Sequence, residues 1–159
     1  MKKLFTALAL SMASALALAV TPFNLPWMNN PEREEFRSED YPTSVFVLEA
    51  YFRGCPYCVD NAPNVHALAE EYADNTLVQV VDVGRDRDDF EYERWISMTN
   101  PNHAVIKDAN KTLLNQFVTR GYPTTVVLDC HLNVKYKTEG VWSNSTKRRI
   151  REVINQTLA

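Results

Sequence analysis

The sequence of 159 residues lacks the features that would assign it to several large classes of protein. It contains no low-complexity run and no internal repeat, which argues against a solenoid or a fibre. It contains no phosphate-binding loop and no dinucleotide fingerprint, and we expect no cofactor. Lys and Arg, 17 in all, are outnumbered by 20 Asp and Glu, so the chain has no basic field to attract nucleic acid. The length suits one domain with a hydrophobic core.

Charged residues are also missing from residues 4–20, directly after the basic start Met1-Lys2-Lys3. This apolar segment is rich in Ala and Leu, and Ala17-Leu18-Ala19 offers small residues at the spacing that a signal peptidase requires. Residues 1–19 are therefore predicted to be a secretory signal, with an uncleaved membrane anchor as the alternative. No cysteine follows the segment, so a lipid anchor is not indicated. The basic start and the Ala-rich core look bacterial, which predicts a periplasmic protein.

Cysteine is scarce, and its three positions divide into a close pair and a single residue. Cys55 and Cys58 form a Cys-x-x-Cys motif, a spacing that serves metal binding, a structural loop or redox chemistry. A zinc site would need a second pair of ligands, and only Cys130 with His131 is available. Counting along the predicted strand from Pro123 at ~3.3 Å per residue places Cys130 about 23 Å away, at the opposite end of the sheet. We therefore expect no metal, and a lone thiol in a turn at Cys130.

Hydrophobic periodicity predicts an α/β fold for the rest of the chain. A strand–helix–strand unit implies a parallel pair, and two later strands with a short connection imply an antiparallel hairpin, which gives a mixed central sheet with helices on both faces. Residues 20–43 contain four prolines and are predicted as an extended lead-in with at most one short helix, and residues 44–159 as the domain. The predicted strands are Ser44–Phe52, Leu77–Val83, His103–Lys107, Thr124–Asp129 and Val134–Thr138. One predicted helix begins at the cysteine pair and ends at Asp74-Asn75. The other predicted helices are Phe90–Met98, Thr112–Val118 and Asn144–Leu158.

The cysteine pair lies between a buried strand and a helix, a position that favours redox chemistry. Cys55 is predicted at the helix N-terminus, with Pro56 at the first helical position, where its missing N–H does no harm. The unpaired backbone N–H groups and the helix dipole there favour a thiolate, so Cys55 is the expected nucleophile. Cys58 lies one turn further in, where we expect it to be less exposed and to resolve a mixed disulfide formed on Cys55.

Glu49 is an unexpected carboxylate within the apolar strand Ser44–Phe52. Burial of a charged carboxylate is unfavourable, so we expect its pKa to be raised and the group to act as a proton acceptor. Its position six residues before Cys55 could place it behind Cys58, whose proton it would take. The alternative is an outward-facing residue at a sheet edge. Surface or core packing is the expected role of His66, His103, Trp95 and Trp142.

Together these features resemble the thioredoxin superfamily over roughly residues 44–157. Glu49 precedes the Cys-x-x-Cys motif, Pro63 lies in the helix that follows it, and Arg120-Gly121-Tyr122-Pro123-Thr124 looks like the cis-proline loop of that superfamily. The resemblance implies a cis bond between Tyr122 and Pro123, a loop that packs over the disulfide, and a Tyr122 backbone that pairs with an extended substrate peptide. The substrate-binding residues expected on this basis are Pro56, Tyr57, Tyr122 and Pro123.

Within the superfamily the chain looks most like the exported TlpA/ResA-type proteins, which carry an additional helix and strand before the cis-proline loop, here Phe90–Met98 and His103–Lys107. The resemblance implies a thioredoxin fold and an exported thiol–disulfide oxidoreductase, with reduction of protein substrates as the favoured direction and a membrane protein as redox partner. The Pro56-Tyr57 dipeptide is typical of glutaredoxins, and the strand Leu77–Val83 lacks the lysine that thioredoxin places near its buried acid. A disulfide oxidase or isomerase of the DsbA type and a non-catalytic binding module are the alternatives.

Overall fold

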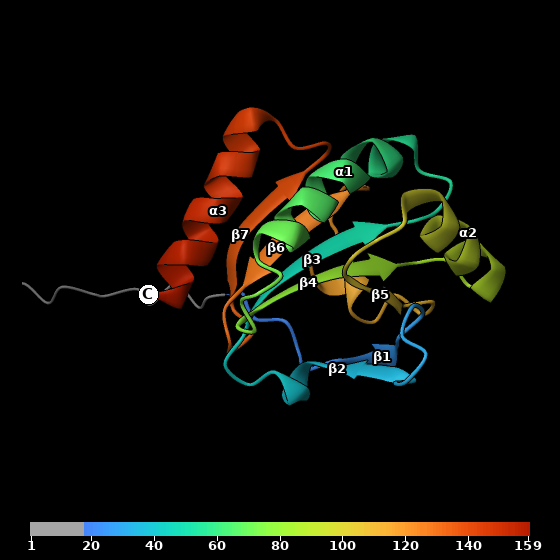
Figure 1. The fold of residues 1–159 in the computed structure, drawn as a ribbon, viewed down its shortest axis with the longest axis horizontal. Helices are drawn as coiled ribbons and strands as arrows, with labels where there is room; N and C mark the ends of the chain where they lie inside the picture. The colour runs from blue at the N-terminus through green and yellow to red at the C-terminus, as the bar shows by residue number, and fades with distance from the viewer. Residues whose placement is uncertain (1–17) are drawn as a thin grey trace, which may run out of the picture.

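A mixed five-stranded sheet lies at the centre of the structure, a computed structural model that describes residues 18–159 (Figure 1). In spatial order its strands are β5 (Ala104–Lys107), β4 (Val78–Gly84), β3 (Val45–Tyr51), β6 (Thr124–Leu128) and β7 (Val134–Glu139). β3, β4 and β5 run parallel to one another, whereas β6 is antiparallel to both β3 and β7. The predicted mixed sheet of an α/β protein is thereby confirmed.

Three α-helices of the described chain accompany the sheet: α1 (Pro56–Glu71), α2 (Asp89–Thr99) and α3 (Asn144–Leu158). α1 connects the parallel strands β3 and β4, which confirms the predicted strand–helix–strand unit. α2 and β5 are the predicted additional helix and strand. α3 begins where the sequence predicted, because the Ser143 hydroxyl accepts a hydrogen bond from the Thr146 N–H.

β3 is buried at every position because it lies between β4 and β6 and is covered on both faces. Its side chains alternate between the two faces, so Val47 and Leu48 belong to separate hydrophobic layers. The Val47 face packs against α1 and α3, which cross the sheet on that side (Figure 1). The helix residues buried there include Val65, Leu68, Ile150 and Ile154.

The opposite face is covered by the segment before β3 and by residues 113–117, so the α-helices predicted for both faces lie on one face only. The lead-in predicted over residues 20–43 is extended, but it pairs with itself as β1 (Asn24–Pro26) and β2 (Glu35–Arg37), followed by the short 3-10 turn η1 (Ser38–Asp40). Phe36 of β2 is almost fully buried and its ring lies 5.1 Å from those of Trp27 and Tyr41. This segment therefore contributes an aromatic cluster to the core.

The helix predicted at Thr112–Val118 is only a 3-10 turn, η2 (Leu114–Gln116). Its buried neighbour Asp108 explains the difference, because the carboxylate accepts hydrogen bonds from the backbone N–H groups of Thr112, Leu113 and Leu114. A side chain that takes up these donors favours a turn over a continuing helix. Leu114 is still buried against the sheet, so the turn fills the place predicted for the helix.

The predicted signal segment lies mostly outside the described residues, of which the first is Leu18. The Leu18 carbonyl accepts from the Val134 N–H at 2.8 Å, and the Val20 N–H donates to the Leu132 carbonyl at 2.9 Å. Residues 18–20 therefore lie against the β6–β7 turn. Within residues 18–159, no helix has both the length and the apolar character needed to cross a membrane.

Gly84, the last residue of β4, lies where two tyrosines approach the backbone. A Cβ at this position would be 2.5 Å from Cε1 of Tyr92 and 3.0 Å from Cζ of Tyr51, and the Tyr92 hydroxyl donates to the Gly84 carbonyl. We expect Gly84→Ala to lower the free energy of unfolding by about 1–3 kcal/mol because the ring must move. Urea unfolding of the oxidised protein measures this change.

Gly121→Ala is the matched control, since no heavy atom lies within 4 Å of a Cβ built there. We expect its free energy of unfolding to stay within about 0.5 kcal/mol of the wild-type value. Equal stability of the Gly84→Ala protein and the wild type would contradict the packing argument.

Candidate active site

Cys55 and Cys58 form a disulfide at the start of α1, with their Cα atoms 5.2 Å apart. Cys55 is the N-cap of the helix and Pro56 is at the first helical position, as the sequence predicted. The Cys58 backbone N–H donates to the Cys55 sulfur at 3.1 Å. A negative sulfur on Cys55 would thus receive a hydrogen bond as well as the favourable end of the helix dipole.

Both cysteines are buried. Cys55 is 3% exposed and Cys58 is 2% exposed, so the predicted difference in exposure between them is small. The disulfide packs among aromatic side chains that include Tyr51 and Trp95. Tyr57, between the two cysteines, is in contrast 66% exposed. A partner that reaches the disulfide therefore meets Tyr57 first, while the sulfurs themselves stay in an apolar environment.

The predicted cis-proline loop lies against the disulfide. The Tyr122–Pro123 bond is cis, and the Tyr122 carbonyl oxygen is 3.7 Å from the Cys55 sulfur. The Tyr122 ring meets the Phe52 ring edge-on at 5.5 Å, and the Arg85 guanidinium stacks on Phe52 at 3.9 Å and on Tyr122 at 4.9 Å. The sequence did not indicate Arg85, which follows β4 and reaches this loop only through the fold.

Glu49 is buried in the centre of β3, so the sheet-edge alternative is excluded. Its carboxyl group accepts hydrogen bonds from the Thr125 hydroxyl and from the Asn61 side-chain amide, the latter at 2.7 Å. Burial, reinforced by repulsion from Asp82, raises the pKa of Glu49 to about 8, although the two hydrogen bonds act in the opposite direction. The raised pKa agrees with the expectation from the sequence.

Asn61, the partner of Glu49, lies one turn after Cys58 on α1. Its side-chain oxygen accepts from the Trp142 N–H at 2.9 Å, and the Trp142 indole donates to the Thr125 hydroxyl at 2.8 Å. These bonds form a closed network around the carboxyl group and fix its orientation. The sequence analysis did not identify Asn61. Its position, a polar residue one turn beyond the Cys-x-x-Cys motif, could have indicated it.

Asp82 is a second buried acid that the sequence analysis missed. It lies in β4 in register with Glu49 and is 3% exposed. The Trp95 indole N–H donates to one carboxylate oxygen at 3.1 Å, and the His103 Nε2 lies 3.1 Å from the other, without the geometry of a hydrogen bond. The signal was present, since Asp82 interrupts an apolar strand just as Glu49 does.

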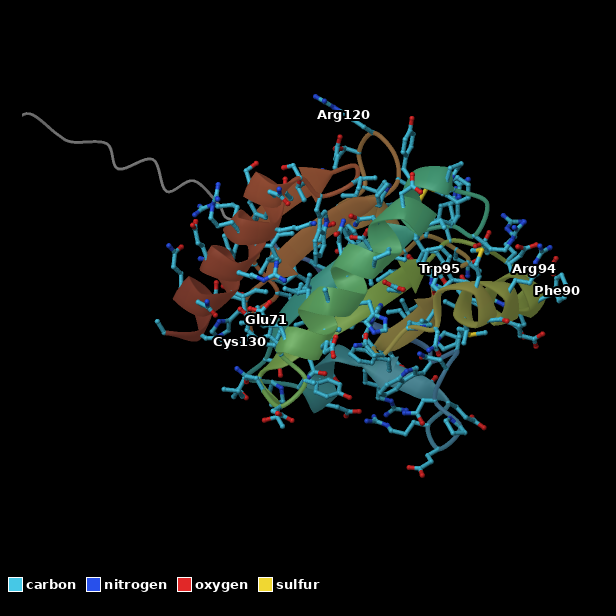
Figure 2. All side chains as sticks on the ribbon, turned by 45° about the horizontal axis from the view of Figure 1, so that its top comes forward. Glu71, Phe90, Arg94, Trp95, Arg120 and Cys130 are labelled. Atoms are coloured by element: carbon cyan, nitrogen blue, oxygen red, sulfur yellow. A yellow bond between two sulfur atoms is a disulfide. The ribbon has the colours of Figure 1, made fainter. Side chains whose placement is uncertain are left out.

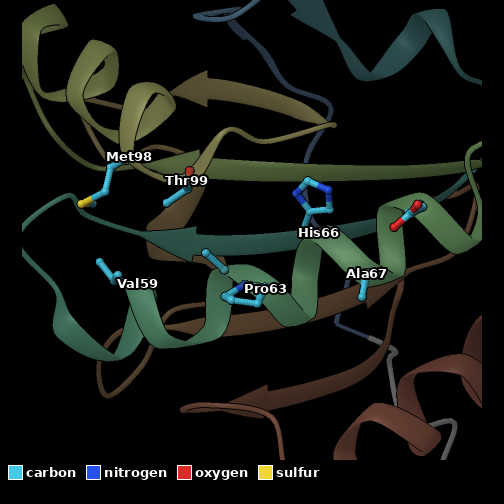
Figure 3. A pocket seen from close by; sticks show the side chains of 8 residues that line it. Val59, Pro63, His66, Ala67, Met98 and Thr99 are labelled. Atoms are coloured by element: carbon cyan, nitrogen blue, oxygen red, sulfur yellow. The ribbon is translucent and has the colours of Figure 1, made fainter.

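A groove of about 520 Å³ runs beside α1 and starts next to the cysteine pair (Figure 3). Val59, the residue after Cys58, lines one end with Pro63, and Met98 and Thr99 at the end of α2 line the side that faces α1. His66 was expected to have a packing role at the surface or in the core. It lies at the surface, in the wall of this groove. The groove offers apolar surface within one helical turn of the disulfide.

Cys130 lies in the turn between β6 and β7, as predicted, and is a free thiol. β6 runs antiparallel to β3, so this turn is at the end of the sheet opposite Cys55. Figure 2 shows Cys130 toward the end of the molecule where α1 finishes at Glu71, and Arg120 of the cis-proline loop at another end. Across residues 18–159, His, Cys, Asp and Glu form no group of three that could hold a metal ion.

A disulfide at the start of α1, a cis-proline loop against it and this sheet order define a protein of the thioredoxin fold with a thiol–disulfide oxidoreductase type of site. The chain belongs to the AhpC/TSA family, whose profile matches residues 17–137. No sequence among curated proteins matches it.

Solved structures of thiol–disulfide exchange proteins share the fold. A proposed thiol:disulfide interchange protein DsbE from Chlorobium tepidum has a TM-score of 0.77 and 19% identity, over 90% of this chain and 97% of that one. A thioredoxin family interchange protein from the same organism has a TM-score of 0.74 and 16% identity, over 92% and 100%. A secreted Mycobacterium tuberculosis disulfide oxidoreductase, homologous to E. coli DsbE, has 0.67 and 15%, over 84% and 95%. The resemblance to the thioredoxin superfamily is confirmed.

Proposed function

We propose that the protein is an exported thiol–disulfide oxidoreductase that reduces disulfides in protein substrates. The observation that carries the proposal is the Cys55–Cys58 disulfide at the N-terminus of α1, with the Tyr122 carbonyl against it and a buried acid, Glu49, hydrogen-bonded to Asn61 of the same helix. A disulfide that only stabilised the fold would need neither the cis-proline loop nor a carboxyl group with a raised pKa. The half-buried thiol of Cys130 takes no part, because it lies at the other end of the sheet.

In the reduced protein, Cys55 starts the reaction as a thiolate. It attacks one sulfur of a substrate disulfide, a mixed disulfide forms, and the second substrate sulfur leaves as a thiolate. Cys58 then gives its proton to the Glu49 carboxylate and attacks the Cys55 sulfur. The Cys55–Cys58 disulfide forms, the first substrate sulfur leaves, and two electrons have passed from the protein to the substrate.

The reverse reaction restores the thiols and uses Glu49 as a proton donor. A thiolate of the electron donor attacks Cys55, the Cys55–Cys58 bond breaks, and Cys58 takes the proton of the Glu49 carboxyl group as it leaves. A pKa of about 8 suits both directions near neutral pH, because the group can lose and regain a proton there. Attack of a second donor thiolate on the mixed disulfide frees Cys55.

Substrate recognition is proposed for the surface around Tyr57 and the cis-proline loop. The Tyr122 backbone next to Pro123 would pair with an extended segment of the substrate, and Pro56 and Tyr57 would contact the residues around its disulfide. The apolar groove along α1 continues this surface. Exposed aromatic and apolar groups of this kind suit unfolded or partly folded chains, in which cysteines are accessible.

The proposal includes export to an oxidising compartment such as a periplasm. Its support is the basic start and uncharged segment of residues 1–19, together with the secreted state of the matched M. tuberculosis protein. Outside the cytoplasm the oxidised protein needs an electron donor that reaches across the membrane. A membrane protein with a thiol pair is therefore the proposed redox partner.

Reduction of insulin by dithiothreitol, followed by the precipitation of its B chain, tests the proposal. We expect the protein to accelerate precipitation well beyond the rate with dithiothreitol alone, and equal rates would exclude oxidoreductase activity on protein disulfides. The redox potential of the Cys55–Cys58 pair, measured against glutathione, then decides whether the protein reduces or oxidises its substrates. A value near ~−270 mV supports the reductase, and a value near ~−120 mV would instead support an oxidase of the DsbA type.

A further inference from the structure

Two buried carboxyl groups are neighbours across β3 and β4, and the chemistry proposed above uses only one of them. Glu49 and Asp82 are register partners in the parallel pair, and each is 3% exposed. Register partners on adjacent strands point to the same face of the sheet, so the two side chains are direct neighbours. Two carboxylates so close in a medium of low dielectric constant repel each other strongly, which favours a pair with one proton and one negative charge.

The surroundings of Asp82 favour the negative charge on that residue. The Trp95 indole N–H donates to Oδ2 at 3.1 Å. The Nε2 of His103 lies 3.1 Å from Oδ1 of Asp82. The side chain of His103 is 5% exposed and that of Asp82 is 4% exposed. The His103 ring is therefore the second polar group that lies against this buried carboxyl group.

Glu49 has only neutral partners, the Thr125 hydroxyl and the Asn61 amide. Burial is the main cause of the raised pKa of Glu49, and repulsion from Asp82 acts in the same direction. The proton of the pair therefore belongs on Glu49.

Few other titratable groups face this pair. Tyr51 is the last residue of β3 and lies on the same face, and its ring stacks on Trp95 at 4.1 Å. Burial raises the pKa of Tyr51 far above its ordinary value, so its hydroxyl is neutral. The titratable groups packed around the two carboxyls are Cys58 from α1, Tyr51 from β3, Tyr92 from α2 and His103 from the segment between α2 and β5.

We propose that Asp82 is a positioning residue of the redox site that acts through Glu49. Its buried negative charge, to which the Trp95 indole donates a hydrogen bond, keeps the proton on Glu49 at neutral pH and so sets the pH at which Glu49 can take the proton of Cys58. This role rests on the proposed function, since it needs proton exchange between Glu49 and Cys58.

The proton balance of the resolving step follows from this arrangement. When Cys58 attacks the mixed disulfide on Cys55, its proton passes to Glu49 and the substrate sulfur leaves as a thiolate. The proton transfer requires a Glu49 carboxylate, which the charge of Asp82 disfavours at low pH. Loss of that charge makes the carboxylate available at lower pH, so the pH profile of the resolving step moves toward acid.

The resolving step can be observed with 5,5′-dithiobis(2-nitrobenzoate) in a Cys130→Ser background, where only the redox pair reacts. One equivalent of reagent gives two releases of coloured thiolate, the first from attack by Cys55 and the second from attack by Cys58. Stopped-flow traces across the pH range yield the midpoint for the second phase. We expect Asp82→Asn to move this midpoint down by about one pH unit. An unchanged midpoint would overturn the proposal.

Two comparisons separate this role from a structural one. Glu93→Gln removes the same charge from an exposed position of α2, and we expect its midpoint to equal that of the parent protein. In a Glu49→Gln background, Asp82→Asn should cause no shift, because the residue through which Asp82 acts is gone. A shift of the same size in that background would show that Asp82 acts on Cys58 directly or through packing, and would overturn the proposal.

A measurement on the unaltered side chains decides the question even where Asp82→Asn fails to fold. Carboxyl ¹³C resonances of the reduced protein, labelled at Asp and Glu, report the charge of each group. At neutral pH we expect the signal of an ionised Asp82 and of a protonated Glu49. The reverse distribution would refute the proposal. A protein whose second phase is missing altogether would instead contradict the proposed function, so the two failures are distinct.

Discussion

Replacement of Cys55 by alanine is expected to reduce insulin-reducing activity to the rate of dithiothreitol alone. The effect is complete because Cys55 is the cysteine whose sulfur accepts the backbone hydrogen bond at the helix N-terminus and lies against Tyr122. Cys58 cannot replace it, since it lies one turn further into the helix and is also buried. The assay compares each variant with the wild type at equal protein concentration.

Cys58→Ala distinguishes the attacking from the resolving cysteine. This variant still forms a mixed disulfide through Cys55 but cannot release it, so covalent adducts with substrates accumulate and are visible on non-reducing gels. Cys130→Ala is the matched control and should keep wild-type activity and form no adducts. Substantial activity in the Cys55→Ala protein, or adducts that depend on Cys130, would contradict the assignment.

Glu49→Gln is expected to have the second largest effect, and it acts on stability and activity in opposite directions. Because the folded pKa of about 8 lies above the unfolded value of 4.5, the folded chain binds more protons than the unfolded chain between these values. The free energy of unfolding therefore falls as pH rises from 4.5 to about 8, and it is unaffected by Glu49 at lower pH. The glutamine variant has no such titration.

We therefore expect Glu49→Gln to be more stable than the wild type by roughly 3 kcal/mol at pH 7 and equally stable near pH 4. Its activity should fall by roughly 100-fold, because a positioned acid–base group has been lost. Urea unfolding at the two pH values and the insulin assay provide both readouts, with Glu93→Gln as control. A stability difference that does not change with pH would show that Glu49 does not hold a proton in the folded state.

The features predicted from the sequence are those that local chemistry determines. The helix begins at Cys55 because Pro56 suits the first turn, and the strand around Glu49 is buried because it is almost entirely apolar. The cis bond at Pro123 was expected only through the resemblance, whose separate features agreed. Each of these features can be predicted from a few adjacent residues or from a known arrangement of such residues.

The features that were missed depend on contacts between distant segments. β2 has three residues, of which only Phe36 is buried, so it carries no periodic signal. The partnership of Asp82 with His103 and Trp95 joins β4 to α2 and to the segment after it, and a sequence without a known register does not reveal it. Asp82 itself could have been found, because the reasoning applied to Glu49 holds equally for an acid in the strand Leu77–Val83.

The segment before β3 also occupies both edges of the central sheet. Next to β5, the Met28 N–H donates to the Val105 carbonyl at 2.8 Å, and Asn29 accepts from the Val105 N–H. Next to β7, Leu18 accepts from the Val134 N–H at 2.8 Å. The backbone groups that could recruit another extended chain are thereby partly used at each edge.

A protein that handles unfolded chains needs this protection more than most. Its proposed partners are extended polypeptides, and an open sheet edge would bind them by strand addition wherever they touched it, without regard to their cysteines. With both edges partly occupied, the proposed pairing with an extended chain would be directed to the Tyr122 backbone, next to Cys55. The lead-in segment would thus serve the proposed selectivity of the protein as well as its hydrophobic core.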